Sequence, residues 1–148
     1  MKNKIKYLFS WTYANEKIYK LYLKAKKYSK LKNKTLVCFY QNKIYNKYHC
    51  VISASSSIKG ILNFPHPMGI VIGEGVYIGK NVTIYQNVTL GRKNKDISEY
   101  PTIEDDVIIY CNSTIIGNVT IGKGAIVGCN SVVLRDVKPG EVVSGIVK

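Results

Sequence analysis

Histidine and cysteine are the side chains most able to do chemistry near neutral pH, and this sequence has two histidines and four cysteines. His66 stands between Pro65 and Pro67, whereas His49 ends a stretch rich in lysine and tyrosine. An imidazole whose pKa is near the ambient pH can take up and return a proton, which makes His66 a candidate acid-base residue. We expect His49 to be structural or exposed to solvent.

The cysteines show no CxxC pair and no other spacing that is typical of a metal site, so we expect no bound metal. No apolar run approaches the roughly 20 residues that would span a bilayer, and no export signal follows the basic N-terminus. These features predict a cytoplasmic protein with reduced, structural thiols. The cysteines are Cys38, Cys50, Cys111 and Cys129.

Charge divides the chain into two parts. The 148 residues carry 22 Lys and Arg against 9 Asp and Glu, and 13 of the basic residues stand before residue 51 with the single acid Glu16. A basic, mainly helical region is therefore expected at 1–50, followed by a nearly neutral domain at 51–148. Apolar residues recur at helical spacing between Ser10 and Asn33, which predicts an amphipathic helix. Residues 36–52 fit either a second short helix or an extended segment.

The basic region holds eight of the twelve tyrosines, which need a surface to pack on. Solvated lysines on a packing helix are therefore the simpler explanation of its composition. The same mixture would also suit an anionic membrane surface, a phosphorylated substrate or nucleic acid. We expect no nucleic-acid partner and keep peripheral contact with the inner face of a membrane as an open alternative.

A six-residue period organises the chain after residue 70. An aliphatic residue recurs at this period, and a small or β-branched residue follows four places later. The aliphatic positions are Ile72, Ile78, Ile84, Leu90, Ile103, Ile109, Ile115, Ile121, Val127 and Val133. The period predicts short parallel strands, three to a triangular coil, whose aliphatic side chains stack in a narrow interior. Glycine or asparagine is expected at the corners, where a positive φ costs little.

Two interruptions break this period. The step after Leu90 is 13 residues, so seven extra residues form a loop within 91–102. Upstream, the step after Phe64 is eight, which places a two-residue insertion around His66. Loops that leave a rigid scaffold are where function usually lies, so both insertions are candidate site segments.

These motifs resemble the hexapeptide-repeat acyltransferases, and within them the serine acetyltransferase-like branch that includes surface-polysaccharide O-acetyltransferases. The most specific stretch runs from His66 to Gly91 and reads HPMGIVIGEGVYIGKNVTIYQNVTLG. It is similar to the family's His-x-x-Gly-Ile-Val segment and to its Gln-x-Val-Thr continuation. The segments IIGNVTIG from Ile115 and SVVLRDVKPG from Ser131 also fit. The resemblance implies a left-handed parallel β-helix that forms a homotrimer, with acetyl-CoA bound between neighbouring prisms.

The resemblance also implies roles for individual residues. His66 aligns with the family's catalytic histidine, a general base that takes the proton of the acceptor hydroxyl while the oxygen attacks the acetyl thioester. Other positions match main-chain contacts to CoA or could reach its phosphates. The matching positions are Arg92, Cys111 and Cys129, and the phosphate candidates are Lys123 and Lys148.

The sequence departs from serine acetyltransferases at the acceptor positions. Val51 replaces the Asp that orients the catalytic histidine, and Pro65 replaces an acceptor-binding Asp. Glu99 and Tyr100 replace the Arg-His pair that grips the amino acid, and Glu99 would repel a carboxylate. We therefore expect Pro65, Glu99 and Tyr100 to bind a sugar hydroxyl of a surface polysaccharide or its precursor.

The sequence thus predicts a mainly β protein, a left-handed parallel β-helix after a short helical region, that acts as an acetyl-CoA-dependent O-acetyltransferase. Its partners would be acetyl-CoA, a saccharide or other hydroxyl acceptor, and two further copies of the chain. Faces that carry Ile70, Val76, Tyr77 and Tyr85 also favour the trimer, because we expect them to expose apolar surface. Two alternatives stay open, a serine O-acetyltransferase and a non-catalytic β-helix for binding or scaffolding.

Overall fold

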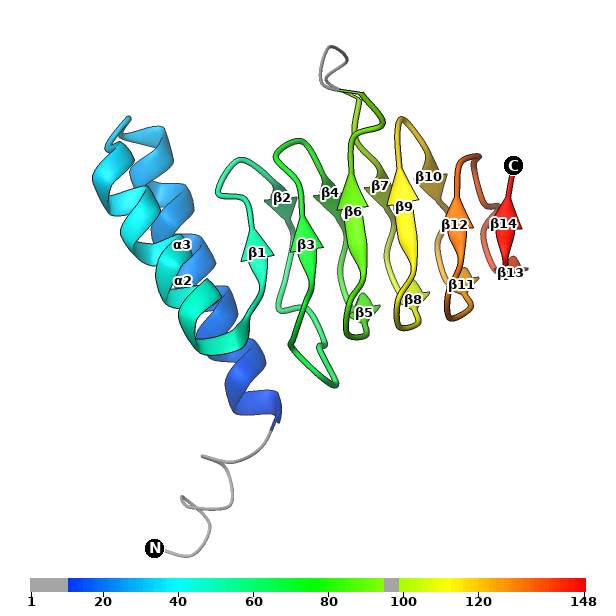
Figure 1. The fold of residues 1–148 in the computed structure, drawn as a ribbon, viewed down its shortest axis with the longest axis horizontal. Coiled ribbons are helices and arrows are strands. Elements are labelled where there is room, and N and C mark those ends of the chain that lie inside the picture. The colour runs from blue at the N-terminus through cyan, green and yellow to red at the C-terminus, as the bar shows by residue number, and fades with distance from the viewer. Residues whose placement is uncertain (1–10, 95–98) are drawn as a thin grey trace, which may run out of the picture.

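The computed structural model describes residues 11–94 and 99–148. Ser10, where the predicted helix begins, and the middle of the predicted loop at 91–102 lie outside the described residues. A helical hairpin precedes a prism of short strands, and the chain advances along the prism from its N-terminal to its C-terminal end (Figure 1). No helix of the described residues combines the length and apolarity needed to cross a bilayer.

The N-terminal hairpin consists of α2 (Trp11–Lys30) and α3 (Lys34–Tyr48). Helix α2 confirms the amphipathic helix within the described residues. For residues 36–52, α3 decides the open alternative in favour of a helix as far as Tyr48, and Val51–Ile52 form the first strand. Asn33 caps α3, because its Oδ1 accepts a hydrogen bond from the Leu36 N–H at 3.1 Å. His49 adopts the left-handed conformation, with φ 51°, and ends the helix two residues before the first strand.

Tyr22 joins the helices to the first coil of the prism. Its side chain is 1% exposed, and its hydroxyl donates to the Ser56 carbonyl oxygen at 2.8 Å and accepts from the Ile58 N–H at 3.2 Å. Ile18, one helical turn earlier, is also buried, whereas Leu23 is exposed. One face of α2 therefore extends the core of the prism at its N-terminal end.

Fourteen short strands of the described residues form three parallel sheets. The first sheet holds β1 (Val51–Ile52), β3 (Val71–Ile72), β6 (Thr89–Gly91), β9 (Thr114–Ile116), β12 (Val132–Val133) and β14 (Ile146–Val147). The second holds β2 (Ser57–Ile58), β4 (Tyr77–Ile78), β7 (Thr102–Ile103) and β10 (Thr120–Ile121). The third holds β5 (Thr83–Ile84), β8 (Ile108–Ile109), β11 (Ile126–Val127) and β13 (Val142–Val143).

The pairing register confirms the coil of three hexads and both insertions. Val71 pairs with Thr89, so one regular coil is 18 residues long. Thr89 pairs with Thr114, which adds the seven residues predicted after Leu90. Val51 pairs with Val71, which adds the two residues predicted around His66. Both insertions therefore leave the ladder of parallel strands intact and extend from its edges.

The interior is a column of aliphatic side chains. Every aliphatic position of the six-residue period is buried, as are the small or β-branched residues four places later. The prediction that Ile70 and Val76 lie on an exposed apolar face is wrong, because both are 0% exposed. They occupy the second inward-facing position of their hexads. Tyr77 does lie on the surface, at 36% exposed.

Asparagine and glycine occur at corners with a positive φ, as expected, but not every glycine of the repeat is such a corner. The glycine directly after an inward aliphatic does not have a positive φ; the residue three places after the aliphatic does, as in Asn81, Asp106 and Asn112. Gly79 instead permits a close approach, since a Cβ there would collide with the Asp105 side chain and backbone. Glycines directly after an inward aliphatic, such as Gly79, therefore serve packing between coils. Asparagine, aspartate or glycine takes the left-handed corners, as Gly124 does with a φ of 68°.

Candidate active site

His66 lies in the two-residue insertion between Asn63, which bridges to Thr83, and strand β3. Its side chain is exposed, whereas Pro67 beside it is buried. The Met68 N–H donates to the His66 carbonyl oxygen at 2.8 Å, which closes a tight turn. Gly69 completes the turn with a φ of 66°, and a Cβ there would collide with the Asn87 side chain. The insertion thus presents the imidazole on a constrained backbone.

Tyr85 lies next to His66, and Tyr110 lies next to Tyr85 on the following coil. The imidazole and the Tyr85 ring have centroids 6.4 Å apart in an edge-to-face arrangement, with 61° between their planes. The Tyr85 and Tyr110 rings stack, with centroids 5.0 Å apart and planes inclined by 23°. These three rings form an aromatic row along one edge of the prism.

Cys111 and Cys129 share this edge. The Asn130 N–H donates to the Cys111 carbonyl oxygen at 2.9 Å, so the two cysteines stand one coil apart, as predicted. Cys111 is half-buried, Cys129 is exposed, and both are free thiols. We call this boundary between the third and first sheets the histidine edge, defined by His66, Tyr85, Tyr110, Cys111 and Cys129.

The other insertion leaves from a different edge. Arg92, Glu99 and Tyr100 lie between the first and second sheets, after β6 and before β7, on what we call the loop edge. The half-buried Tyr100 ring covers Gly73 and Gly75, and a Cβ on Gly73 would be 3.0 Å from Tyr100 Cε1. The strands of the first sheet are parallel. His66 precedes β3 and lies where these strands begin, whereas this loop follows β6 and lies where they end (Figure 1).

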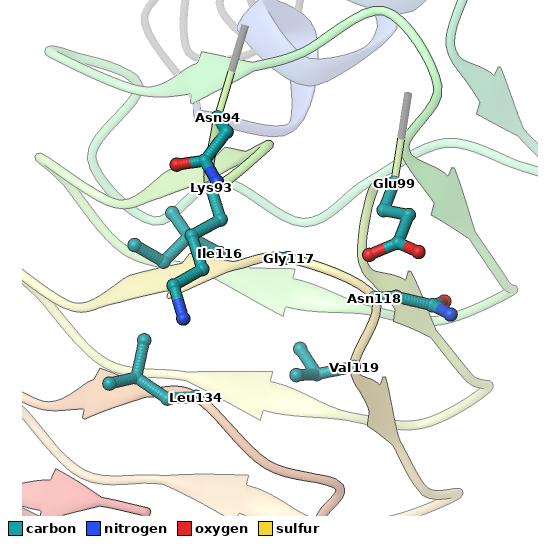
Figure 2. A pocket seen from close by; sticks show the side chains of 8 residues that line it. All are labelled: Lys93, Asn94, Glu99, Ile116, Gly117, Asn118, Val119 and Leu134. Atoms are coloured by element: carbon teal, nitrogen blue, oxygen red, sulfur yellow. The ribbon is translucent and has the colours of Figure 1, made fainter. Parts of the chain in front are cut away.

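A pocket of about 150 Å³ lies at the loop edge. In Figure 2 the Lys93 side chain extends toward Leu134, and Glu99 reaches in from the opposite side, toward Asn118. The full lining is Lys93, Asn94, Glu99, Ile116, Gly117, Asn118, Val119 and Leu134. The pocket therefore combines an ammonium group, a carboxylate and an amide with an apolar floor.

Lys123 lies on the third edge, after β10. Its ammonium Nζ is 3.8 Å from Asp106 Oδ2, and its N–H donates to Glu104 Oε2 at 2.7 Å. Lys148 is exposed at the end of the chain, beyond β14. One prism therefore does not gather Arg92, Lys123 and the two edge cysteines at a single place.

His49 lies at the end of α3. Its ring meets Tyr45 edge-to-face, with centroids 6.4 Å apart and planes inclined by 80°. This ring pair lies at the end of the helical hairpin, whereas the His49 carbonyl oxygen accepts a hydrogen bond at 3.0 Å from the N–H of Gly69, in the turn that carries His66. Among the described residues, no group of histidine, cysteine and acidic side chains is arranged to hold a metal ion.

The sequence analysis did not identify Lys93, Tyr85 and Tyr110 as site residues. A signal was present for the tyrosines, since each directly follows an inward-facing isoleucine, Ile84 or Ile109, and these two positions pair in the register. Aligning the sequence coil by coil, with the seven-residue loop removed, brings the tyrosines together. Lys93 carries no comparable signal, because its place depends on the path of the loop.

The fold and these edges define a hexapeptide-repeat β-helix, and comparisons with known proteins agree. Residues 100–135 match the family model described as bacterial transferase hexapeptide (six repeats). A serine acetyltransferase of Bacillus pumilus is 39% identical over 120 residues, covering 73% of this chain and 55% of that protein. A serine acetyltransferase of Buchnera aphidicola is 36% identical over 115 residues, covering 76% of this chain and 42% of that protein.

Solved structures give the same result. The serine acetyltransferase of Vibrio cholerae has a TM-score of 0.82 at 33% identity, covering 86% of this chain and 50% of that chain. A serine acetyltransferase in complex with CoA has a TM-score of 0.80 at 31% identity, covering 86% and 53%. The fold is thus the predicted left-handed parallel β-helix, and the chain belongs to the serine acetyltransferase-like branch of the hexapeptide-repeat family. It spans about half the length of the relatives it matches.

Proposed function

We propose that this chain is an acetyl-CoA-dependent O-acetyltransferase in which His66 is the general base. The observation that carries the proposal is the exposed imidazole, held by a constrained turn on the same edge as Cys111 and Cys129. The similarity to serine acetyltransferases supports the same activity, including CoA as the acyl carrier. A non-catalytic scaffold is less well supported, because a scaffold function does not account for an exposed histidine on a constrained turn.

The reaction follows from the chemistry of the imidazole. The unprotonated ring nitrogen of His66 takes the proton of the acceptor hydroxyl, and the oxygen attacks the carbonyl carbon of the acetyl thioester. The carbon–sulfur bond then breaks, and the imidazolium returns the proton to the CoA thiolate. Backbone groups at Cys111 and Cys129 would line the pantetheine arm, and Arg92 and Lys123 would contact other parts of CoA.

We also propose that the active unit is a homotrimer. His66 lies on one edge of the prism and the loop pocket on another, so contact between neighbouring prisms would bring the histidine edge of one chain to the loop edge of the next. Within each chain of the trimer, we propose that residues 1–50 form the helical region and residues 51–148 form the β-helix domain. Light scattering should give three times the 16.6 kDa of one chain. A monodisperse monomer that is fully active would contradict the shared site.

L-serine is the acceptor that the comparisons favour over the predicted sugar, because the relatives described above are serine acetyltransferases. The loop pocket supplies a structural reason for L-serine binding that the sequence analysis did not identify. Lys93 provides a cation for the carboxylate, and Glu99 across the pocket provides an anion for the ammonium group. The expected repulsion between Glu99 and the serine carboxylate is therefore offset by Lys93.

A sugar hydroxyl of a surface polysaccharide precursor is the second candidate. Pro65 beside His66 carries no charge that would select an amino acid, and Glu99 is able to accept hydrogen bonds from hydroxyl groups. Tyr100 has less freedom to stack on a sugar than we expected, because one part of its ring covers Gly73 and Gly75. Two residues thus favour this candidate: Pro65, because it is uncharged, and Glu99, because it accepts hydrogen bonds from hydroxyl groups.

Free-thiol release from acetyl-CoA, measured with L-serine and with UDP-sugars, tests the proposal. We expect kcat/KM for L-serine to exceed that for the best sugar by at least about tenfold. Lys93→Ala should raise the KM for L-serine by about tenfold while the KM for acetyl-CoA stays unchanged, because a charge-assisted contact is lost. Lys80→Ala, a change of an exposed lysine on the β-helix, is the control. A better sugar would support the second candidate.

We further propose that the helical hairpin contacts an anionic membrane surface, with the chain in the cytoplasm. Residues 11–50 carry ten lysines and a single acidic residue. Leu23 and Leu31 are 44% and 63% exposed, and they surround a surface depression of about 370 Å³ together with Lys26, Lys27 and Lys30. Exposed leucines framed by lysines suit the interface of an anionic bilayer.

A further inference from the structure

The aromatic row at the histidine edge has the geometry of a support for His66. The 6.4 Å separation of the imidazole and Tyr85 centroids and the 5.0 Å separation of the two tyrosine centroids both fall within the roughly 4.5–7 Å range of favourable aromatic pairs. The 61° between the imidazole and Tyr85 planes is an edge-to-face arrangement, and the two tyrosines are nearly parallel. Each ring therefore limits the rotation of the next.

The backbone beneath the tyrosines is rigid. Tyr85 follows Ile84 and Tyr110 follows Ile109, and both isoleucines are 0% exposed in the core. The Tyr85 N–H donates to the Ile109 carbonyl oxygen at 2.9 Å. The Tyr110 N–H donates to the carbonyl oxygen of the next coil at the same distance. Both rings thus project from paired positions of the parallel ladder, where side-chain direction is set by the pleat.

The row ends at Tyr110. The position that pairs with Tyr110 on the following coil is Gly128, which has no side chain to continue the stack. Tyr110 is 38% exposed, whereas Tyr85 between its two neighbours is only partly exposed. Tyr85 is therefore the ring that contacts His66, and Tyr110 supports Tyr85 from the far side.

We infer that Tyr85 is a positioning residue for His66, supported by Tyr110. A general base has to keep its ring nitrogen within hydrogen-bond reach of the acceptor hydroxyl, and locked neighbouring side chains provide such precision. This inference rests on the proposed function, because it assigns His66 the role of the base.

The first test uses Tyr85→Ala and Tyr85→Phe in acetyl transfer to L-serine. Tyr85→Ala should lower kcat by about tenfold or more, with the KM for acetyl-CoA within about twofold of wild type. Tyr85→Phe keeps the ring and should restore at least half of kcat. Tyr45→Ala is the matched control, because it removes an edge-to-face partner of similar geometry from His49. Tyr110→Ala should give a smaller loss of kcat. If Tyr85→Ala does not fold, Tyr110→Ala tests whether the aromatic row supports His66.

A second measurement does not depend on activity. The His66 ring protons should show a ring-current shift in the NMR spectrum that is lost in Tyr85→Ala and kept in Tyr85→Phe. Unchanged His66 resonances and an unchanged kcat in folded Tyr85→Ala would overturn the inference and leave His66 as the base. A wild-type protein without acetyl transfer, but with the expected ring-current shift, would instead overturn the proposed function.

Discussion

Asn87 donates a hydrogen bond from its Nδ2 to Oδ1 of Asn112 on the next coil, at 3.0 Å. Asn112 repeats the contact with Asn130 at 3.1 Å. The three residues have φ angles of 58°, 60° and 55°, so each stands at a left-handed corner. Their neighbours in sequence include Cys111 and Cys129, which places this asparagine ladder directly beside the histidine edge.

Asn112→Ala should lower the free energy of unfolding by about 2 to 3 kcal/mol. The variant loses both ladder hydrogen bonds and places a Cβ-bearing residue without a polar side chain in the left-handed region. Asn112→Gly loses the same hydrogen bonds but tolerates the positive φ, so its loss should be only about 1 kcal/mol. Denaturant unfolding measures both values, and equal losses would contradict the role of backbone conformation.

Glu141 should make stability depend on pH. Arg135 Nη2 donates to its Oε1 at 3.0 Å, and this hydrogen bond, followed by one from the Lys138 N–H, lowers the pKa of Glu141 from the ordinary 4.5. A carboxyl with a lowered folded pKa contributes stability above its unfolded pKa and loses it as the pH falls through the folded value. Glu141→Gln should therefore lower Tm at neutral pH, and this difference should shrink below about pH 4.5.

The thermal unfolding of Arg135→Gln provides the partner measurement for Glu141. Removal of the guanidinium leaves only the Lys138 N–H on the carboxylate, so the variant should show part of the same pH dependence. A difference from wild type that stays constant from neutral to acidic pH would show that packing of the last coils, and not the charge of Glu141, controls the effect.

His66→Ala should reduce acetyl transfer at least about a hundredfold, the usual size of a lost general base. The affinity for CoA and the thermal stability should remain those of wild type, because the side chain is exposed on its turn. Steady-state kinetics with isothermal titration of CoA measures both. His49→Ala is the control and should retain wild-type turnover, whereas near-normal turnover of His66→Ala would refute the assignment of the base.

Vesicle sedimentation tests the membrane contact of the hairpin. The protein should bind vesicles of phosphatidylserine and phosphatidylcholine but not phosphatidylcholine alone, and salt should weaken the binding. Lys27→Glu/Lys30→Glu should reduce binding at least about tenfold, since each lysine contributes about 1 kcal/mol near an anionic surface. The matched control, Lys80→Glu/Lys138→Glu, changes exposed lysines of the β-helix. Equal losses in both variants would show that only net charge matters.

The sequence by itself determined the β-helix. A coil of three hexads needs one inward aliphatic residue in every hexad, and the six-residue period supplies it. The spacing from Leu90 to Ile103 and from Phe64 to Ile72 was sufficient to locate both insertions, since any extra residue must leave the ladder. The second helix remained open because the apolar residues from Leu36 to Tyr45 fit helix and strand equally. Its Asn33 cap and its packing against α2 decide that choice.

Only the tertiary structure decided which residues meet. Glu99 and His66 were expected at one acceptor site, yet one chain holds them on different edges of the prism, while Tyr85 and Tyr110, 25 residues apart in sequence, stack. Periodicity reports whether a side chain points inward or outward, which is a property of each strand. Which outward side chains become neighbours depends on the register between coils and on the path of the inserted loops, and long-range backbone hydrogen bonds determine both.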